Sequence, residues 1–117
     1  MGRLLFIPLF VVLVLTGMQT EARAVDVIKI GNIEPFSGPS APMGLLGRQA
    51  RDMAVEEINS AGGIKSMGGA KIEMIYVDSK SDPTVGVTEA ERLINVEKVH
   101  ALMGCWNSAV SYPVTQR

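Results

Sequence analysis

The residue types best suited to chemistry lie close together near the end of the chain, in the segment Gly104-Cys105-Trp106-Asn107-Ser108. Ser108 stands where a predicted strand leads into a predicted helix, and the first N–H groups of a helix lack partners and favour an anion. A serine in this position either caps the helix or turns its hydroxyl to a bound carboxylate. Trp106 either lines a pocket or packs in a core. These residues are therefore candidates for a binding site.

Covalent and metal chemistry have little support in the sequence. Cys105 would need a base to act as a nucleophile, and only His100 is close to it in sequence. A lone histidine is more often structural, and we interpret Cys105 as a buried, inert thiol. Glu56 and Glu57 lie on the solvated side of a predicted helix, and no cluster of side chains has the spacing of a metal site. We therefore predict that the protein is not an enzyme and holds no metal or cofactor.

Two further classes of function are disfavoured. The 11 Lys and Arg residues are scattered among 12 Asp and Glu residues, whereas a nucleic-acid-binding protein usually gathers a basic excess on one face. A nucleotide-dependent α/β enzyme would need a phosphate-binding loop. Gly38, Gly44 and Gly47 do not form the G-x-G-x-x-G pattern, and no Walker lysine follows them.

Residues 1–24 have the pattern of a secretory signal peptide. After Arg3, residues 4–15 form an apolar run broken only by Pro8, and the segment ends in Ala22-Arg23-Ala24, a small-x-small cleavage site. The apolar run is too short to cross a bilayer comfortably, since about 20 residues are needed, which disfavours a retained membrane anchor. We predict cleavage after Ala24 and a periplasmic or other extracytoplasmic location for residues 25–117.

The rest of the chain alternates between strand and helix patterns. Strands are predicted at 27–33, 71–78 and 99–103, and helices at 45–61, from Asp82-Pro83 onwards, and after Ser108. This alternation predicts an α/β fold with an open, doubly wound parallel sheet. Ligands bind such sheets outside the carboxyl ends of the strands. With the strand order 2-1-3, loops 34–44 and 104–108 would meet at one edge.

Apolar periodicity predicts which side of each helix is buried. In the first helix the predicted inward stripe is Leu46, Ala50, Met53, Ala54, Ile58 and Ala61, and the predicted solvated side is Arg48, Arg51, Asp52, Glu56, Glu57 and Asn59. In the second helix the predicted buried side is Val87, Ala90, Leu93 and Ile94. Gly62 and Gly63 are predicted to end the first helix in left-handed conformations.

Several motifs together resemble one known family, the type I periplasmic binding proteins of the branched-chain amino acid (Leu/Ile/Val) group, which serve ABC importers. The matching pieces are Ser37-Gly38-Pro39, residues 54–59, residues 61–65, Asp78, Asp82-Pro83 and Gly104, in the order and nearly the spacing of the family. The resemblance covers residues 27–113. It implies two α/β lobes that close on a ligand, of which residues 25–117 would form part of the N-terminal lobe.

The resemblance also implies a site and partners. The apolar side of the pocket falls on Met43, and the hydroxyl that binds an amino acid carboxylate falls on Ser108. Ser37 either fixes its loop or touches ligand, and the segment with Trp106 and Asn107 looks more like members that bind short amides or urea. The expected partners are a small amino-acid, amide or urea-like ligand and the membrane permease of an importer. The alternative is the same lobe in a receptor or regulator that senses small molecules.

Overall fold

The computed structural model describes residues 25–117, and the predicted signal peptide lies outside the described residues. The elements are β1 (Val27–Glu34), α1 (Ala41–Ser60), the 3-10 turn η1 (Lys65–Met67), β2 (Lys71–Asp78), α2 (Pro83–Asn95), β3 (Ala101–Gly104) and α3 (Ser108–Val114). The strands form one parallel sheet in the order β2-β1-β3. This architecture confirms the predicted α/β fold and strand order.

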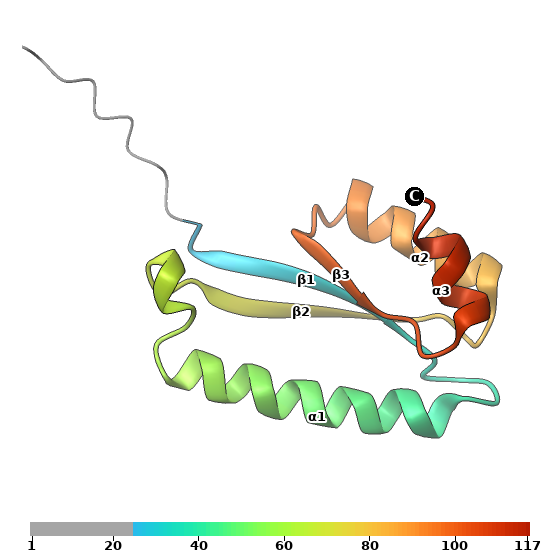
Figure 1. Ribbon diagram of the computed structural model, residues 1–117, viewed down its shortest axis with the longest axis horizontal. Helices are drawn as coiled ribbons and strands as arrows, with labels where there is room; N and C mark the ends of the chain where they lie inside the picture. The colour runs from blue at the N-terminus through green and yellow to red at the C-terminus, as the bar shows by residue number, and fades with distance from the viewer. Residues whose placement is uncertain (1–24) are drawn as a thin grey trace, which may run out of the picture.

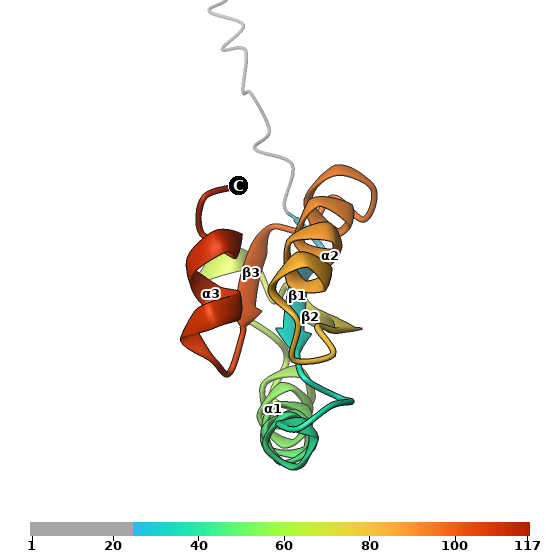
Figure 2. The same ribbon diagram turned by 90° about the vertical axis from the view of Figure 1, so that its right-hand side faces the viewer.

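The helices lie on both faces of the sheet. Figures 1 and 2 show α1 along one face, and α2 and α3 together on the other. This arrangement is the one that parallel strands joined by helical crossovers produce. Among the described residues, no helix combines the length and apolar character needed to cross a membrane.

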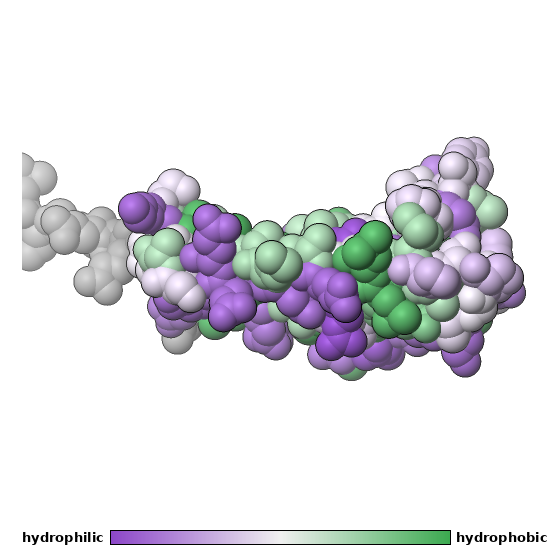
Figure 3. Space-filling model, turned by 90° about the horizontal axis from the view of Figure 1, so that it is seen from below, coloured by the Kyte–Doolittle hydropathy of each residue, from purple (hydrophilic) through white to green (hydrophobic). Residues whose placement is uncertain are grey.

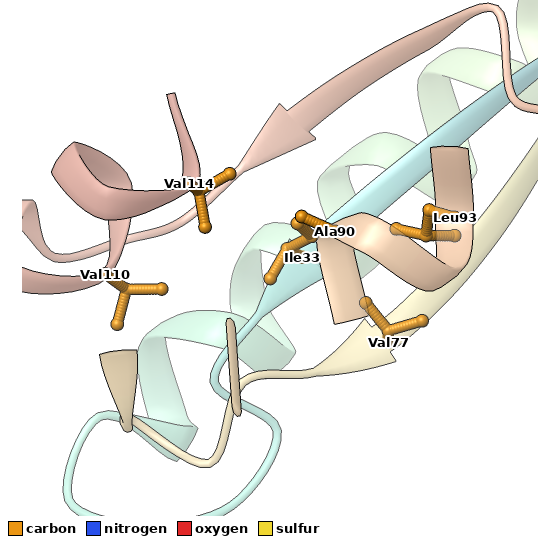
Figure 4. Close-up of a cluster of buried hydrophobic side chains, with 6 residues drawn as sticks. All are labelled: Ile33, Val77, Ala90, Leu93, Val110 and Val114. Carbon is orange, nitrogen blue, oxygen red and sulfur yellow. The ribbon is translucent and has the colours of Figure 1, made fainter. Parts of the chain in front are cut away.

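The hydrophobic core lies between the sheet and the pair α2 and α3. Its buried members are Ile33, Val77, Ala90, Leu93, Val110 and Val114, whose side chains converge in Figure 4. Burying a Val, Leu or Ile side chain contributes about 1.5–3 kcal/mol to the stability of the fold. Ala90 and Leu93 confirm the predicted buried side of α2, whereas Ile94 is 38% exposed, and its prediction is wrong.

Short sequence motifs correctly predicted the start of α2 and the end of α1. The carboxylate of Asp82 caps α2 by accepting hydrogen bonds from Thr84 N (2.8 Å) and Val85 N (3.0 Å). Gly62 and Gly63 have φ of 102° and 82°, as predicted for the end of α1.

Two boundaries differ from the sequence prediction. Helix α1 begins at Ala41, four residues before the predicted start at residue 45, because Met43 N and Gly44 N already donate to Ser40 O. Strand β3 begins at Ala101 because the backbone of Val99 turns to donate to Leu93 O.

The predicted inward stripe of α1 is wrong. Its six residues are all exposed, Met53 at 72% and Leu46 at 60%. The helix turns Arg51 and Asn59 towards the sheet instead: Arg51 pairs with Glu34, and the Asn59 amide donates to and accepts from the Ile72 backbone at 2.8 Å. The strands present polar groups on this face, and leaving them unpaired would cost more than exposing apolar side chains. Figure 3 shows apolar and hydrophilic residues side by side on the outer surface of α1.

Candidate ligand-binding site

The two loops expected to form the site meet at one edge of the sheet. Ile33 of β1 and Gly104 of β3 are register partners, and Cys105 N donates to Ile33 O at 2.5 Å. Both strands end here, so the loop to α1 and the loop to α3 leave from neighbouring positions (Figure 1). The prediction that these loops share the carboxyl edge of the sheet is therefore confirmed.

The loop from β1 to α1 is fastened to Asp78 at the end of β2. The Asp78 carboxylate accepts hydrogen bonds from Phe36 N (2.8 Å), Ser37 N (3.2 Å), Ser37 Oγ (2.6 Å) and Lys80 N (2.8 Å). Burial opposes ionisation of Asp78, but these hydrogen bonds prevail and hold its pKa below the ordinary value. The charged carboxylate thus fixes the course of the loop.

A second set of contacts holds the same loop. Ser81 Oγ accepts from Ser40 N and donates to Ser37 O, both at 3.3 Å. Gly38 has φ of +80°, and a Cβ there would lie 2.8 Å from Lys80 O, so only glycine lets the two loops approach this closely. The loops that follow β1 and β2 are therefore packed together through their backbones.

The loop from β3 to α3 is held by side chains of its own. Asn107 caps α3, because its Oδ1 accepts from Val110 N at 2.9 Å. Ser111 Oγ lies 2.7 Å from Cys105 O and 3.0 Å from Asn107 O, each a carbonyl that it can reach as a donor. The helix start is thereby fixed without a contribution from the Ser108 side chain.

The five predicted site residues fall into two groups. The hydroxyl of Ser37 is engaged as a donor to Asp78, and the amide of Asn107 is engaged as a helix cap. Met43 and Trp106 are 39% and 56% exposed, and Ser108 is exposed with no side-chain hydrogen bond to any residue in the described part of the chain. Met43, Trp106 and Ser108 therefore keep surface that a ligand can contact.

A cavity borders this edge of the sheet on the side of α3, next to Ile33 and Gly104. It measures about 140 Å³ and lies between β3 and α3, against residues that include Leu102, Cys105, Ser111 and Thr115. None of the five predicted site residues lines it. We place the candidate site at the two loops because Met43, Trp106 and Ser108 keep exposed surface there.

Sequence reasoning missed a buried ion pair beneath these loops. Glu34 Oε1 lies 2.5 Å from Arg51 Nη2, and the side chains are 4% and 25% exposed. Asn32, two residues earlier on the same face of β1, is fully buried and donates to Met103 O. The signal was the pair of polar residues at i and i+2 near the end of a strand rich in Val and Ile, since such residues share one face and need a partner.

A cluster of aromatic and charged side chains holds α1 against β2. Tyr76 donates to Asp52 at 2.6 Å, and the Arg48 guanidinium lies 4.7 Å from the Tyr76 ring centroid. Burial, together with the hydrogen bond and negative charge of Asp52, raises the pKa of Tyr76 to about 12. The phenol therefore stays protonated and donating at neutral pH.

The side chains at this edge suit non-covalent binding. Burial, and next the negative charge of Glu34, raise the pKa of the Cys105 thiol, which disfavours the nucleophilic thiolate. His100 lies at the other end of β3, where it accepts from Lys29 N at 3.0 Å and donates its own backbone N–H to Lys29 O, so it ties the start of β3 to β1. Within residues 25–117, no group of His, Cys, Asp and Glu side chains could hold a metal ion.

Comparison with known proteins agrees with this geometry. Residues 27–117 match the family described as periplasmic binding protein. The chain belongs to this family. The leucine-, isoleucine-, valine-, threonine- and alanine-binding protein of Pseudomonas aeruginosa is 34% identical over 107 residues, which make up 92% of this chain and 28% of that protein. The family is one of solute-binding proteins rather than a class of enzymes.

Two solved structures extend the match to three dimensions. The branched-chain amino acid transporter substrate-binding protein of Streptococcus pneumoniae, in complex with isoleucine, has a TM-score of 0.72 and 32% identity over 77% of this chain and 25% of its own. A fatty acid ABC transporter substrate-binding protein from Thermomonospora curvata has a TM-score of 0.71 and 32% identity over 79% of this chain and 22% of its own. The resemblance inferred from the sequence motifs is confirmed, and the chain spans less than a third of each of these relatives.

Proposed function

We propose that residues 25–117 are part of the first lobe of an extracytoplasmic solute-binding protein, which captures an amino acid or a related small molecule for import through an ABC transporter. The observation that carries the proposal is the meeting of two loops at one edge of the sheet, with Met43 and Ser108 exposed beside them. Membership of a periplasmic family and the predicted signal peptide support the location.

The proposed mechanism is capture without covalent chemistry. The ligand carboxylate accepts a hydrogen bond from Ser108 Oγ, and the ligand side chain packs against Met43, with Trp106 beside the polar end. A hydrogen bond to a charged group contributes about 1.5–3 kcal/mol once water is excluded. A second lobe then encloses the ligand, and the permease binds the closed form.

The named ligands of the relatives share one chemical group. The Pseudomonas protein is named for five amino acids, the Streptococcus structure holds isoleucine, and the Thermomonospora protein is named for fatty acids. All of these ligands carry a carboxylate. We therefore place the carboxylate at Ser108, whose hydroxyl has no partner among the described residues. An amide or urea, which the segment 104–108 also suggests, would present a carbonyl oxygen to the same hydroxyl.

Calorimetry on the full-length mature protein tests the proposal. The ligands are leucine, alanine, a medium-chain fatty acid, acetamide and urea, and we expect an amino acid to bind most tightly. Ser108→Ala should weaken that binding at least about tenfold, the lower limit for the loss of a hydrogen bond to a charged group. Ser66→Ala, at an exposed serine of η1, is the matched control. Unchanged affinity in Ser108→Ala would remove Ser108 from the site, and the absence of binding by every ligand would refute the proposed function.

A further inference from the structure

The loops that follow β1 and β2 form one interlocked unit. Asp78 accepts hydrogen bonds from both loops, through Phe36 and Ser37 on one side and Lys80 on the other. Ser81 adds two contacts across the same junction. We call the residues Ser37, Asp78 and Ser81 the loop latch.

The backbone of the second loop is strained at the latch. Lys80 and Ser81 are consecutive non-glycine residues with φ of 53° and 59°, in the left-handed region that L-residues seldom adopt. Such strain persists only where surrounding contacts determine the conformation, and here those contacts are the hydrogen bonds of the loop latch. The hydrogen bonds of the loop latch hold the two loops in one arrangement and offset the cost of these two left-handed residues.

The latch is connected to Met43 through a short path of backbone contacts. Ser37 is followed by Gly38, whose carbonyl accepts from Ala41 N at 3.2 Å in the first turn of α1. Gly44, in the same turn, would place a Cβ 2.1 Å from Pro35 O, so the turn lies directly on the loop. The position of Met43 thus depends on the course of the loop that Asp78 fixes.

We propose that the loop latch positions the apolar wall of the ligand site before ligand arrives, so that Asp78 is an affinity-determining positioning residue that does not touch ligand. This inference rests on the proposed function. Binding to a wall that is already ordered avoids the entropic cost of ordering it in the complex. Ser108 is held by the separate contacts of Asn107 and Ser111, so the latch acts on Met43 and not on Ser108.

The contacts of Asp78 and those that hold Ser108 form separate networks, so double-mutant cycles in the full-length protein can test the proposal. We expect Asp78→Asn to weaken amino-acid binding about tenfold, because it removes the charge that strengthens the bonds from the backbone N–H groups to Oδ1 and replaces the oxygen that accepts from Ser37 Oγ with a donor. In a Met43→Ala background the same change should cost at most about twofold, whereas in a Ser108→Ala background the full cost should remain. Asp26→Asn, at an exposed aspartate beyond the opposite end of β1, is the matched control and should not change affinity.

Amide hydrogen exchange tests the latch without ligand. Asp78→Asn should speed exchange at Phe36 and Ser37 about tenfold and leave the Lys71 amide, which pairs with Asp26 O, unchanged. Ser81→Ala, which keeps all Asp78 contacts, should give the same pattern at about threefold and serves if Asp78→Asn does not fold.

The outcomes separate the two proposals. Wild-type protein that binds no amino acid would refute the proposed function, and the exchange rates would still decide whether the latch orders the loop. Wild-type protein that binds normally while Asp78→Asn binds equally well, or loses affinity equally in both backgrounds, would overturn the positioning role of Asp78.

Discussion

Gly104 of β3 lies so close to its register partner Ile33 of β1 that a Cβ at position 104 would be 2.3 Å from Ile33 O. Its φ of +107° is also one that L-residues rarely adopt. Both features follow from the tight turn that carries the chain from β3 into the candidate site. The loop before Ser108 therefore depends on the absence of a side chain at this position.

Gly104→Ala should destabilise the protein through strain and a backbone clash together. Gly62→Ala is the control, because Gly62 has a similar φ of +102° but no atom within 4 Å of its Cβ position. We expect Gly104→Ala to cost at least about 2 kcal/mol more than Gly62→Ala in urea unfolding, the typical cost of forcing extra volume into packed structure. Equal costs would mean that the clash is relieved by movement of β3.

Asp82→Ala should remove the cap of α2. Two backbone N–H groups lose their acceptor, and such a loss costs about 1 kcal/mol. Asp82→Asn is the control, because asparagine caps about as well as aspartate. The free energy of unfolding is measured for both variants. An Asp82→Ala protein as stable as the wild type would show that water replaces the cap at no cost.

Arg51→Met should leave the buried Glu34 carboxylate without its cation. Breaking one partner of a buried pair costs about 3 kcal/mol, whereas replacing both with apolar residues is often nearly neutral. We therefore expect Arg51→Met to destabilise strongly and the double variant Glu34→Leu, Arg51→Met to recover most of the loss. A double variant as unstable as the single one would show that Glu34 is held mainly by other groups.

The contribution of Asp78 to stability should depend on pH in one direction. Its pKa is lowered in the folded protein from the ordinary 3.8, so the ionised group stabilises the fold above that value. This stabilisation is lost as the pH falls through the lowered pKa of the folded state. Wild type should therefore exceed Asp78→Asn in stability at neutral pH, with a gap that closes in acid. Ser37→Ala removes one of the donors, so it should narrow the gap; a gap that widens in acid would contradict the assignment.

The sequence predicted the fold well because its signals are local. Val and Ile runs, the Asp82-Pro83 start and the Gly62-Gly63 stop each act within a few residues, and each was confirmed. The orientation of α1 was not predicted, because it depends on Glu34 and Ile72, which lie 17 and 13 residues from their partners in the helix. The spacing of apolar residues in a helix carries no information about the polar groups that the sheet presents to that helix.

The candidate site was likewise predicted only in part from the sequence. The edge at which Met43 and Ser108 lie follows from strand order, which sequence reasoning provided. The role of Asp78 did not follow, although the residue belongs to the motifs that carried the family resemblance, because its partners Phe36 and Ser37 are 42 and 41 residues away. Contacts of that separation become visible only when the loops are placed side by side.

Asn107 supplies the cap of α3, so the start of this helix requires no hydrogen bond from the side chain at position 108. Substitutions at position 107 should therefore lower the free energy of unfolding, whereas substitutions at position 108 should leave it nearly unchanged. Under the proposed function, position 108 can therefore vary with the ligand while the fold is kept.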